Sequence, residues 1–319
     1  MAVYTDLNPD ELAALLAHYE LGPVKAFAAI AEGVENSNFM LETTRGRFIL
    51  TIFEARVTQA DLPFFMAVMA RLAERGFPAP RPIATLNGDF ITHAKGKPAA
   101  IVSFLDGDWP RHPTIAHCRA VGAALARMHL ALGGFEMERI NALGPEGWEA
   151  LTRPRLARAQ SLRPGLAEAI TSDLAEVRAR WPSHLPTGAI HADLFPDNAL
   201  FEGERLSGVI DFYFACTDFL AYDLAVCVNA WCFDAAGGYD ITKGRALIAA
   251  YENVRPLEPA ERAALPVLAR GAALRFFATR LADWADTPAG ALVRPKDPLE
   301  YADKLAFHRG AQGATEYGG

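Results

Sequence analysis

The sequence predicts an α+β protein with two lobes, a small antiparallel β-rich N-terminal lobe and a larger, mainly helical C-terminal lobe. Strand-like segments dominate the first hundred residues, and helical periodicity dominates after a polar, turn-rich connection at residues 106–110 (DGDWP). The length of 319 residues and the 51% hydrophobic content suffice for a core in each lobe. We therefore expect the N-terminal lobe to cover residues 1–105 and the C-terminal lobe to cover residues 106–319.

The N-terminal lobe is expected to begin with a helix, because Asn8 and Pro9 form a cap and two acidic residues follow in the first turn. This helix should end near Gly22. Apolar residues at helical spacing predict one further helix over residues 58–75. Asn87-Gly88 predicts a hairpin turn. The predicted strands cover residues 27–30, 38–43, 47–53 and 99–105.

The C-terminal lobe combines long helical segments with short strands near residues 199–202 and 207–211. The last residues, 312–319, are expected to be loosely ordered. The predicted helices cover residues 114–132, 165–180, 218–235, 242–252 and 258–285.

Charge and composition exclude several classes of protein. The net charge is −7, and the absence of a dense Lys/Arg tract argues against a nucleic-acid partner. No uncharged apolar stretch approaches the roughly 20 residues that span a bilayer, and the N-terminus does not resemble a signal peptide. The four cysteines stand in apolar surroundings and are interpreted as reduced core thiols of a cytoplasmic protein. The sequence does not decide between a monomer and a homodimer.

One segment carries a chemical signal. His191, Asp193 and Asn198 have the spacing H-x-D-x-x-x-x-N of a kinase catalytic loop, and Asp211 follows after a short hairpin. Such a set provides a base for a hydroxyl, here Asp193, and oxygen ligands for Mg²⁺, here Asn198 and Asp211. Single Asp and Asn residues usually cap turns. Their order and spacing together favour ATP-dependent phosphoryl transfer, with the nucleotide expected in the crevice between the lobes.

Two further residues are expected to support this loop. His191 should brace the loop and is not expected to contact the substrate. Asp223 lies inside an apolar run and needs buried partners, for which the backbone amides of the catalytic loop are the best candidates.

The nucleotide-binding signal of the N-terminal lobe is weaker. The polar turn at residues 32–39 (EGVENSNF) could cover phosphates through its amides, with Ser37 and Asn38 as candidates, but it lacks a G-x-G-x-x-G motif. Thr51 stands where a phosphate-pairing lysine or arginine is expected, so Arg56 or Arg47 would have to replace it.

The end of the apolar strand is a candidate for adenine recognition. Backbone groups around Ser103 and Leu105 would lie at the junction of the lobes, where they could receive the base. An ordinary buried strand explains these residues almost as well.

The sequence resembles the aminoglycoside phosphotransferase/choline kinase superfamily, and within it the bacterial homoserine kinases of the ThrB type. The resemblance is carried by VENSNF (34–39), FILTIFE (48–54), DLPFF (61–65), HADLFPDN (191–198), IDFYFACTD (210–218) and YDLAVCVNAWCFD (222–234). It extends over nearly the whole chain and implies a bilobal, protein-kinase-like fold. Thr51 departs from the superfamily's basic residue, which leaves the phosphate clamp open.

The resemblance implies ATP-dependent phosphorylation of the side-chain hydroxyl of L-homoserine, on the route to threonine, with Mg²⁺ as cofactor. The zwitterionic substrate needs a partner for its carboxylate and another for its ammonium group. A kinase of choline, an amino sugar or an aminoglycoside with the same fold, and a catalytically silent kinase-like binding module, are the alternatives. The candidate substrate-pocket residues are Tyr213, Asp218, Asn229, Trp231 and Arg275.

Overall fold

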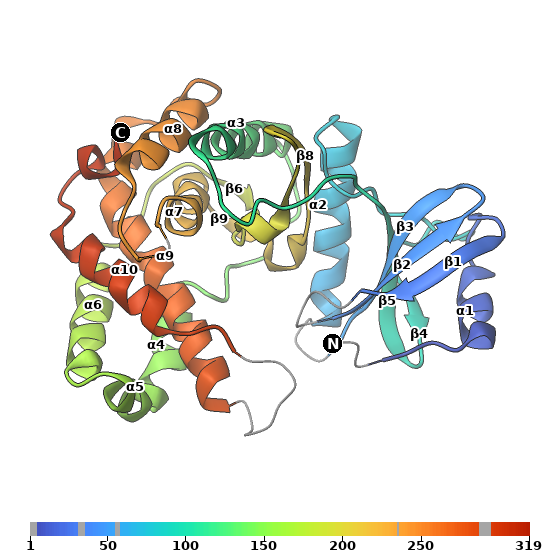
Figure 1. Ribbon diagram of the computed structural model, residues 1–319, viewed down its shortest axis with the longest axis horizontal. Helices are drawn as coiled ribbons and strands as arrows, with labels where there is room; N and C mark the ends of the chain where they lie inside the picture. The colour runs from blue at the N-terminus through green and yellow to red at the C-terminus, as the bar shows by residue number, and fades with distance from the viewer. Residues whose placement is uncertain (1–4, 31–35, 55–57, 235, 287–294) are drawn as a thin grey trace. The chain divides into compact units, whose positions relative to one another are not determined.

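The chain divides into two compact units, which are described separately (Figure 1). A computed structural model describes residues 5–30, 36–54, 58–234, 236–286 and 295–319. The first unit comprises Met1–Asp106 together with Gly208–Tyr213, and the second comprises Gly107–Ser207 together with Phe214–Gly319. Asp211 therefore belongs to the first unit, although it follows the catalytic-loop motif in sequence. The assignment of nucleotide binding to residues 1–105 and of catalysis to residues 106–319 stays a prediction.

The first unit is built on one antiparallel sheet with the strand order β1-β2-β3-β5-β4. Side chains of β2 alternate between buried and half-buried, so that Phe39 and Leu41 enter the core on one face. Leu12 and Leu15 of the first helix pack in the same apolar cluster. The elements are α1 (Pro9–Leu16), β1 (Val24–Ala29), β2 (Ser37–Thr43), β3 (Gly46–Ile52), α2 (Leu62–Glu74), β4 (Thr92–Ala94) and β5 (Lys97–Ser103).

Two expectations about the first unit are wrong in detail. The first helix ends at Leu16, well before Gly22. The hairpin turn lies at Lys95–Gly96, between β4 and β5, and both turn residues have positive φ angles of 51° and 76°. A two-residue hairpin turn of the favoured type requires such angles, which Gly96 adopts without strain. Asn87-Gly88 forms only a local turn, closed by a hydrogen bond from Gly88 N to Thr85 O.

The second unit is mainly helical, and a long helix, α9, runs through its centre (Figure 1). Helices α4, α6, α7 and α10 pack against α9, and most of the α9 side chains are buried. The helices are α3 (Ile115–Ala131), α4 (Pro145–Thr152), α5 (Leu156–Leu162), α6 (Leu166–Arg180), α7 (Leu220–Trp231), α8 (Ile241–Glu252), α9 (Pro259–Asp286) and α10 (Leu299–Gly310). The strands are β6 (Thr187–Ile190), β7 (Ala199–Glu202), β9 (Cys216–Phe219) and β8 (Arg205–Val209), of which the last two residues belong to the first unit. They form two small two-stranded sheets, β6-β9 and β7-β8.

The C-terminal tail differs from the expectation of a loose end. A short 3-10 turn over Ala314–Tyr317 buries Tyr317 completely. The Tyr317 hydroxyl pairs with His308 Nδ1 at 2.7 Å, and its backbone oxygen accepts a hydrogen bond from the Tyr239 hydroxyl. The single aromatic residue of the tail thus fixes it against α10 and against Tyr239, which precedes α8.

Within the described residues, no helix is both long and apolar enough to cross a membrane. Cys118, Cys216, Cys227 and Cys232 are all buried free thiols, as expected from their apolar surroundings.

A cluster of charged side chains on α9 and α10 is expected to contribute to the stability of the fold. Glu300 pairs with Arg280 at 2.5 Å and with the buried Lys304 at 2.8 Å. Burial opposes its ionisation, but the two cations outweigh this effect and lower the pKa of Glu300 to about 2. The Glu300 side chain remains 48% exposed, so solvent screens much of the interaction.

We therefore expect Glu300→Gln to lower the free energy of unfolding by about 1 kcal/mol at neutral pH. Because the folded-state pKa is depressed, this contribution is complete above the unfolded value of 4.5 and decreases as the pH falls toward about 2. Urea denaturation of both proteins at pH 7 and at about pH 3.5 checks this expectation, since the difference should narrow at the lower pH. A difference that stays constant across this range would contradict the assigned cause.

Candidate functional site

The H-x-D-x-x-x-x-N segment forms a loop that leaves the end of a short strand. Strand β6 pairs antiparallel with β9, from Thr187 opposite Phe219 to Ile190 opposite Cys216. His191 follows immediately, and a 3-10 turn over Pro196–Asn198 leads into β7. The loop is therefore held at both ends by paired strands.

The residue before Asp193 has an unusual backbone conformation. Ala192 has a φ of 65°, in the left-handed region that costs a non-glycine residue roughly 1–2 kcal/mol. Among the described non-glycine residues, only Lys95, Ala192 and Asp211 have a positive φ. Two of these three residues thus lie next to, or in, the predicted catalytic set, and such strain persists where surrounding contacts enforce it.

The buried carboxylate of Asp223, on α7, enforces this conformation. Its Oδ2 accepts a hydrogen bond from His191 N and its Oδ1 accepts one from Ala192 N, each at 2.8 Å. This contact supports the scaffolding role that the sequence analysis assigns to Asp223. His191 itself is fully buried, and its Nδ1 accepts a hydrogen bond from Asp193 N at 3.2 Å.

Asp223 has partners that sequence reasoning missed. His129 Nε2, on α3, lies 3.1 Å from Asp223 Oδ2, and the Tyr251 hydroxyl lies 2.8 Å from His129 Nδ1. Burial works against ionisation of Asp223, but the bond with His129 and the backbone amides outweigh it and hold its pKa below the usual value. A histidine on the buried face of the helix over 114–132 was the only available signal, and spacing alone could not pair it with Asp223.

Asp193 and Asn198 lie together. Asn198 Nδ2 donates to the backbone oxygen of Asp193 at 2.8 Å and lies 3.3 Å from Asp193 Oδ2. Its Oδ1 accepts no hydrogen bond from the part of the chain that the structure describes, so a neutral oxygen ligand is available there. The Asp193 side chain is about one-fifth exposed, with a relative accessibility of 20%.

Two large side chains contact the loop from the helices behind it. Trp231 Nε1, on α7, donates to Leu194 O at 2.8 Å. Arg275, on α9, donates through Nη1 to Ala192 O, and its Nη2 lies 3.7 Å from Asp193 Oδ1. Both side chains are almost completely buried, so both contact the loop from its protein side.

Asp211 and Tyr213 lie in the first unit. Asp211 follows β8, is exposed, and has a φ of 63°. The Tyr213 ring meets the rings of Phe53 and Phe65 edge-on, at centroid distances of 5.0 and 5.9 Å. Burial raises the pKa of Tyr213, and the hydrogen bond with Thr51 only partly offsets this effect. Tyr213 is half-buried and packs against the two phenylalanine rings of this unit.

The remaining two candidates for the substrate pocket, Asn229 and Asp218, differ in burial and in their hydrogen-bond partners. Asn229 is fully buried and donates from Nδ2 to Ala225 O and Ala269 O, while its Oδ1 pairs with His308. These contacts favour a scaffolding role. Asp218 is half-buried and accepts a hydrogen bond from Asn141 at 2.7 Å; burial raises its pKa.

The nucleotide-binding candidates of the first unit are placed at opposite ends of the sheet. The Ser37 hydroxyl donates to Glu54, and Asn38 Oδ1 accepts from Thr51, each at 2.8 Å. Ser103 Oγ accepts from Arg81 N at 2.9 Å, at the far end of β5. Neither backbone polar group of Leu105 has a hydrogen-bond partner among the described residues.

The cation that would replace the missing lysine is not assigned by these contacts. Arg56 lies outside the described residues. Arg47 lies at the start of β3, stacks on Phe104, and pairs with Asp106 at 2.5 Å. It is therefore distant along the strand from Ser37 and Asn38, which pair with the end of β3.

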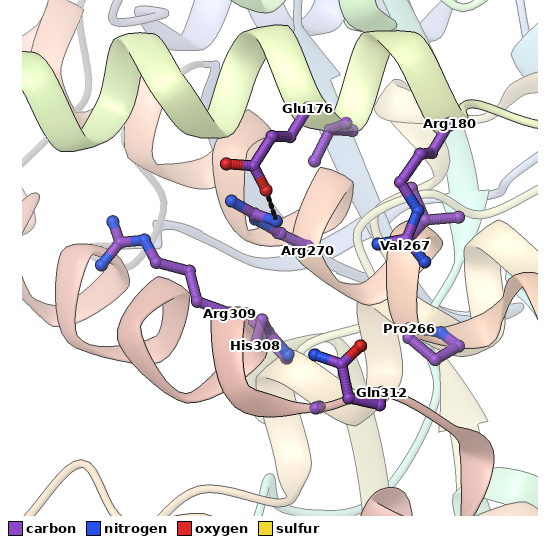
Figure 2. A pocket seen from close by; sticks show the side chains of 10 residues that line it. Glu176, Arg180, Pro266, Val267, Arg270, His308, Arg309 and Gln312 are labelled. Atoms are coloured by element: carbon purple, nitrogen blue, oxygen red, sulfur yellow. Dashed lines mark hydrogen bonds and ion pairs between the residues drawn. The ribbon is translucent and has the colours of Figure 1, made fainter.

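A small cavity of about 80 Å³ lies in the second unit (Figure 2). Arg180, Arg270 and Arg309 line it, from α6, α9 and α10. Arg270 pairs with Glu176 at 2.8 Å, and both Arg270 and Arg309 bind the buried Asp173. The cavity shares no lining residue with the H-x-D-x-x-x-x-N loop, and its most buried arginine, Arg270, already has two acidic partners.

Comparison with known proteins shows the family to which the chain belongs. Residues 26–257 match the model of the "Phosphotransferase enzyme family". Homoserine kinases from Xanthobacter autotrophicus and Sinorhizobium fredii are each 57% identical over 318 residues, covering 100% of this chain and 99% and 98% of theirs. A similarity of this extent, far above 30% identity, shows common family membership.

Solved structures share the fold at low sequence identity. A choline kinase from Cryptosporidium parvum matches with a TM-score of 0.65 at 15% identity over 94% of both chains. A spectinomycin phosphotransferase solved with ADP and spectinomycin matches with a TM-score of 0.67 at 13% identity over 98% of both chains. These matches confirm the protein-kinase-like fold class. This chain belongs to the phosphotransferase enzyme family, and within it to the group that contains the homoserine kinases.

Proposed function

We propose that this protein transfers the γ-phosphoryl group of ATP to the side-chain hydroxyl of L-homoserine, giving ADP and O-phospho-L-homoserine. The observation that carries the proposal is the full-length similarity to homoserine kinases, at 57% identity over 318 residues. The loop geometry supports the reaction class, because Asp193 is partly exposed on a loop fixed by buried contacts.

In this proposal Asp193 is the general base. The substrate hydroxyl oxygen attacks the γ-phosphorus, its proton passes to the Asp193 carboxylate, and the bond from the γ-phosphorus to the bridging oxygen breaks, with ADP as the leaving group. Catalysis of this kind depends mainly on positioning, since the protein forms no covalent bond in the step. The buried bonds of Asp223 and His191 serve this positioning.

Asn198 and Asp211 are proposed to hold Mg²⁺. Hard oxygen ligands suit this ion, and the unused Oδ1 of Asn198 and the exposed carboxylate of Asp211 are such ligands. When bound, the ion neutralises charge on the transferred phosphoryl group. The left-handed backbone of Asp211 supports its assignment, since strained residues cluster at functional positions.

Leu105 is the best-supported nucleotide-binding candidate, because its backbone N–H and C=O can pair with the edge of an adenine. Asn38, Ser103 and Arg56 remain proposals for the same ligand. Ser37 is proposed to act through its backbone, since its hydroxyl is bonded to Glu54.

Asp218 is proposed to receive the ammonium group of homoserine. Its carboxylate is half-buried, and Asn141 is its one side-chain hydrogen-bond partner among the residues that the structure describes. The raised pKa of Asp218 reflects burial, and an ammonium partner would compensate this cost. Tyr213 is proposed as a wall of the substrate site, and the buried Asn229 and Trp231 as its supports.

The test is a substrate panel. The protein is incubated with MgATP and L-homoserine, L-serine, choline or an aminoglycoside, and ADP release is followed; phosphorus NMR then identifies the product. We expect strong stimulation by L-homoserine alone and loss of activity with EDTA, restored by added Mg²⁺. Preference for another alcohol would reject homoserine but retain the kinase assignment, and no turnover with any alcohol would reject both. Protein carrying Asp193→Asn, purified in parallel, controls for contaminating kinases.

A further inference from the structure

Arg275 is a buried charge that contacts the loop of the catalytic motif and two aromatic rings. Its side chain is 2% exposed. The guanidinium carbon lies 4.5 Å from the centre of the Phe276 ring and 5.5 Å from that of Phe214. These rings restrict the guanidinium plane, which presents one nitrogen to Ala192 O and another toward Asp193 Oδ1.

The strained peptide at Ala192 is therefore held from two directions. On one side, Asp223 accepts hydrogen bonds from the backbone N–H groups of His191 and Ala192. Arg275 donates to the carbonyl oxygen of Ala192 on the other. Because this carbonyl belongs to the peptide bond that joins Ala192 to Asp193, its orientation fixes the direction in which the Asp193 side chain leaves the loop.

We propose that Arg275 is a positioning residue for Asp193, and that it does not receive the carboxylate of the substrate. The guanidinium orients the base twice, through the preceding peptide and through the ion pair with the carboxylate. The inference rests on the proposed function, because it takes Asp193 as the base.

The alternative, that Arg275 binds the substrate's carboxylate, conflicts with its environment. Two guanidinium nitrogens already face the loop, and almost none of the side chain is accessible. A substrate carboxylate would have to displace Ala192 O or Asp193, and either displacement would release the catalytic loop. Lysine could not replace Arg275 fully, since one ammonium cannot span two acceptors with the geometry of a guanidinium fork.

A double-mutant cycle tests the proposal. The kcat values of wild type, Arg275→Met, Asp193→Asn and the double variant are measured, with single-turnover assays for the slow proteins. We expect Arg275→Met to lower kcat by about 10²-fold, the scale of a misplaced catalytic group, with little change in KM. In the Asp193→Asn background the same substitution should lower kcat less than about 3-fold, because a residue that acts through Asp193 has nothing left to position.

The possible outcomes distinguish the assignment of Asp193 as the base from the positioning role of Arg275. If Asp193→Asn keeps nearly wild-type turnover, the assignment of the base fails. If Asp193→Asn is slow but Arg275→Met has the same cost in both backgrounds, only the role of Arg275 is overturned. A rise in KM for L-homoserine at constant kcat would also overturn it, in favour of substrate binding. Should Arg275→Met not fold, Arg275→Lys enters the same cycle, with a smaller kcat loss and the same cancellation expected.

Arg270→Met is the matched control. Arg270 lies on the same helix and is also buried. It pairs with Glu176 (Figure 2) and with Asp173, and not with the loop. We expect this variant to be less stable in thermal denaturation but to keep kcat within about 3-fold per folded molecule. A loss of kcat similar to that of Arg275→Met would show that any buried arginine of α9 produces the effect, and would reject the specific role.

Discussion

Replacing Asp193 by asparagine is expected to lower kcat by about 10²–10⁴-fold, the usual contribution of a positioned general base. The amide has the same shape, and the hydrogen bond from Asn198 Nδ2 to the backbone oxygen of residue 193 does not depend on the side chain. The fold and the substrate affinities should therefore change little. Steady-state kinetics with L-homoserine and MgATP, together with thermal denaturation, measure both effects.

Asp197→Asn is the control for this experiment. Asp197 lies on the same loop, is exposed, and pairs with Lys296 at 3.6 Å. Replacing the Asp197 carboxylate removes the same charge from the loop and costs little stability, because its ion pair is exposed. We therefore expect kcat to stay within about 3-fold of the wild-type value. Comparable losses in both variants would show that loop charge, and not the proton acceptor, accounts for the result.

The second large effect is expected for Asp223→Asn. Asparagine offers one acceptor oxygen where the carboxylate offers two, so at least one of the buried amides of His191 and Ala192 loses its partner. Unsatisfied buried donors and a broken buried pair cost about 3 kcal/mol in unfolding free energy. Because the strained Ala192 peptide is released, kcat should fall at least about 10-fold as well. Chemical denaturation and steady-state kinetics on the same preparation measure the two losses.

Asp240→Asn is the matched control, because it makes the same substitution at a helix N-cap outside the loop. Asp240 also accepts two backbone N–H groups, from Thr242 and Lys243, but as the N-cap of α8. Asparagine caps helices about as well as aspartate, so stability and kcat should both stay close to wild type. If Asp223→Asn were equally mild, Asp223 would not be what holds the loop.

Most of the fold could be predicted from the sequence, because long elements have a clear hydrophobic periodicity and capped helices have recognisable residues at their ends. Asn8, Gly76 and the helical periodicity of residues 258–285 each mark an element that the structure contains. The turn at Asn87-Gly88 was wrong, because Lys95-Gly96 forms the hairpin and a non-glycine residue with positive φ has little sequence signature. The short helices α4 and α5, and α10, were missed because their apolar residues form no long repeat.

The sequence predicts the part of the candidate site whose residues lie close together in one segment. His191, Asp193 and Asn198 share one short loop, so their order fixes their proximity. His129 contacts the Asp223 carboxylate, which lies 94 positions later in the sequence. Arg275 contacts Ala192 of the loop, which lies 83 positions earlier. Contacts at such separations depend on the packing of α3, α7 and α9, which periodicity alone does not specify.

The assignment of Gly208–Tyr213 to the first unit has a consequence for the gene. Val209 N donates to Pro78 O at 2.8 Å, and the Tyr213 ring packs between Phe53 and Phe65. A fragment that stops at residue 106 lacks these contacts and leaves both phenylalanine faces uncovered. The unit is therefore discontinuous in the coding sequence, and exchanging it between relatives by recombination requires crossovers at both of its segments.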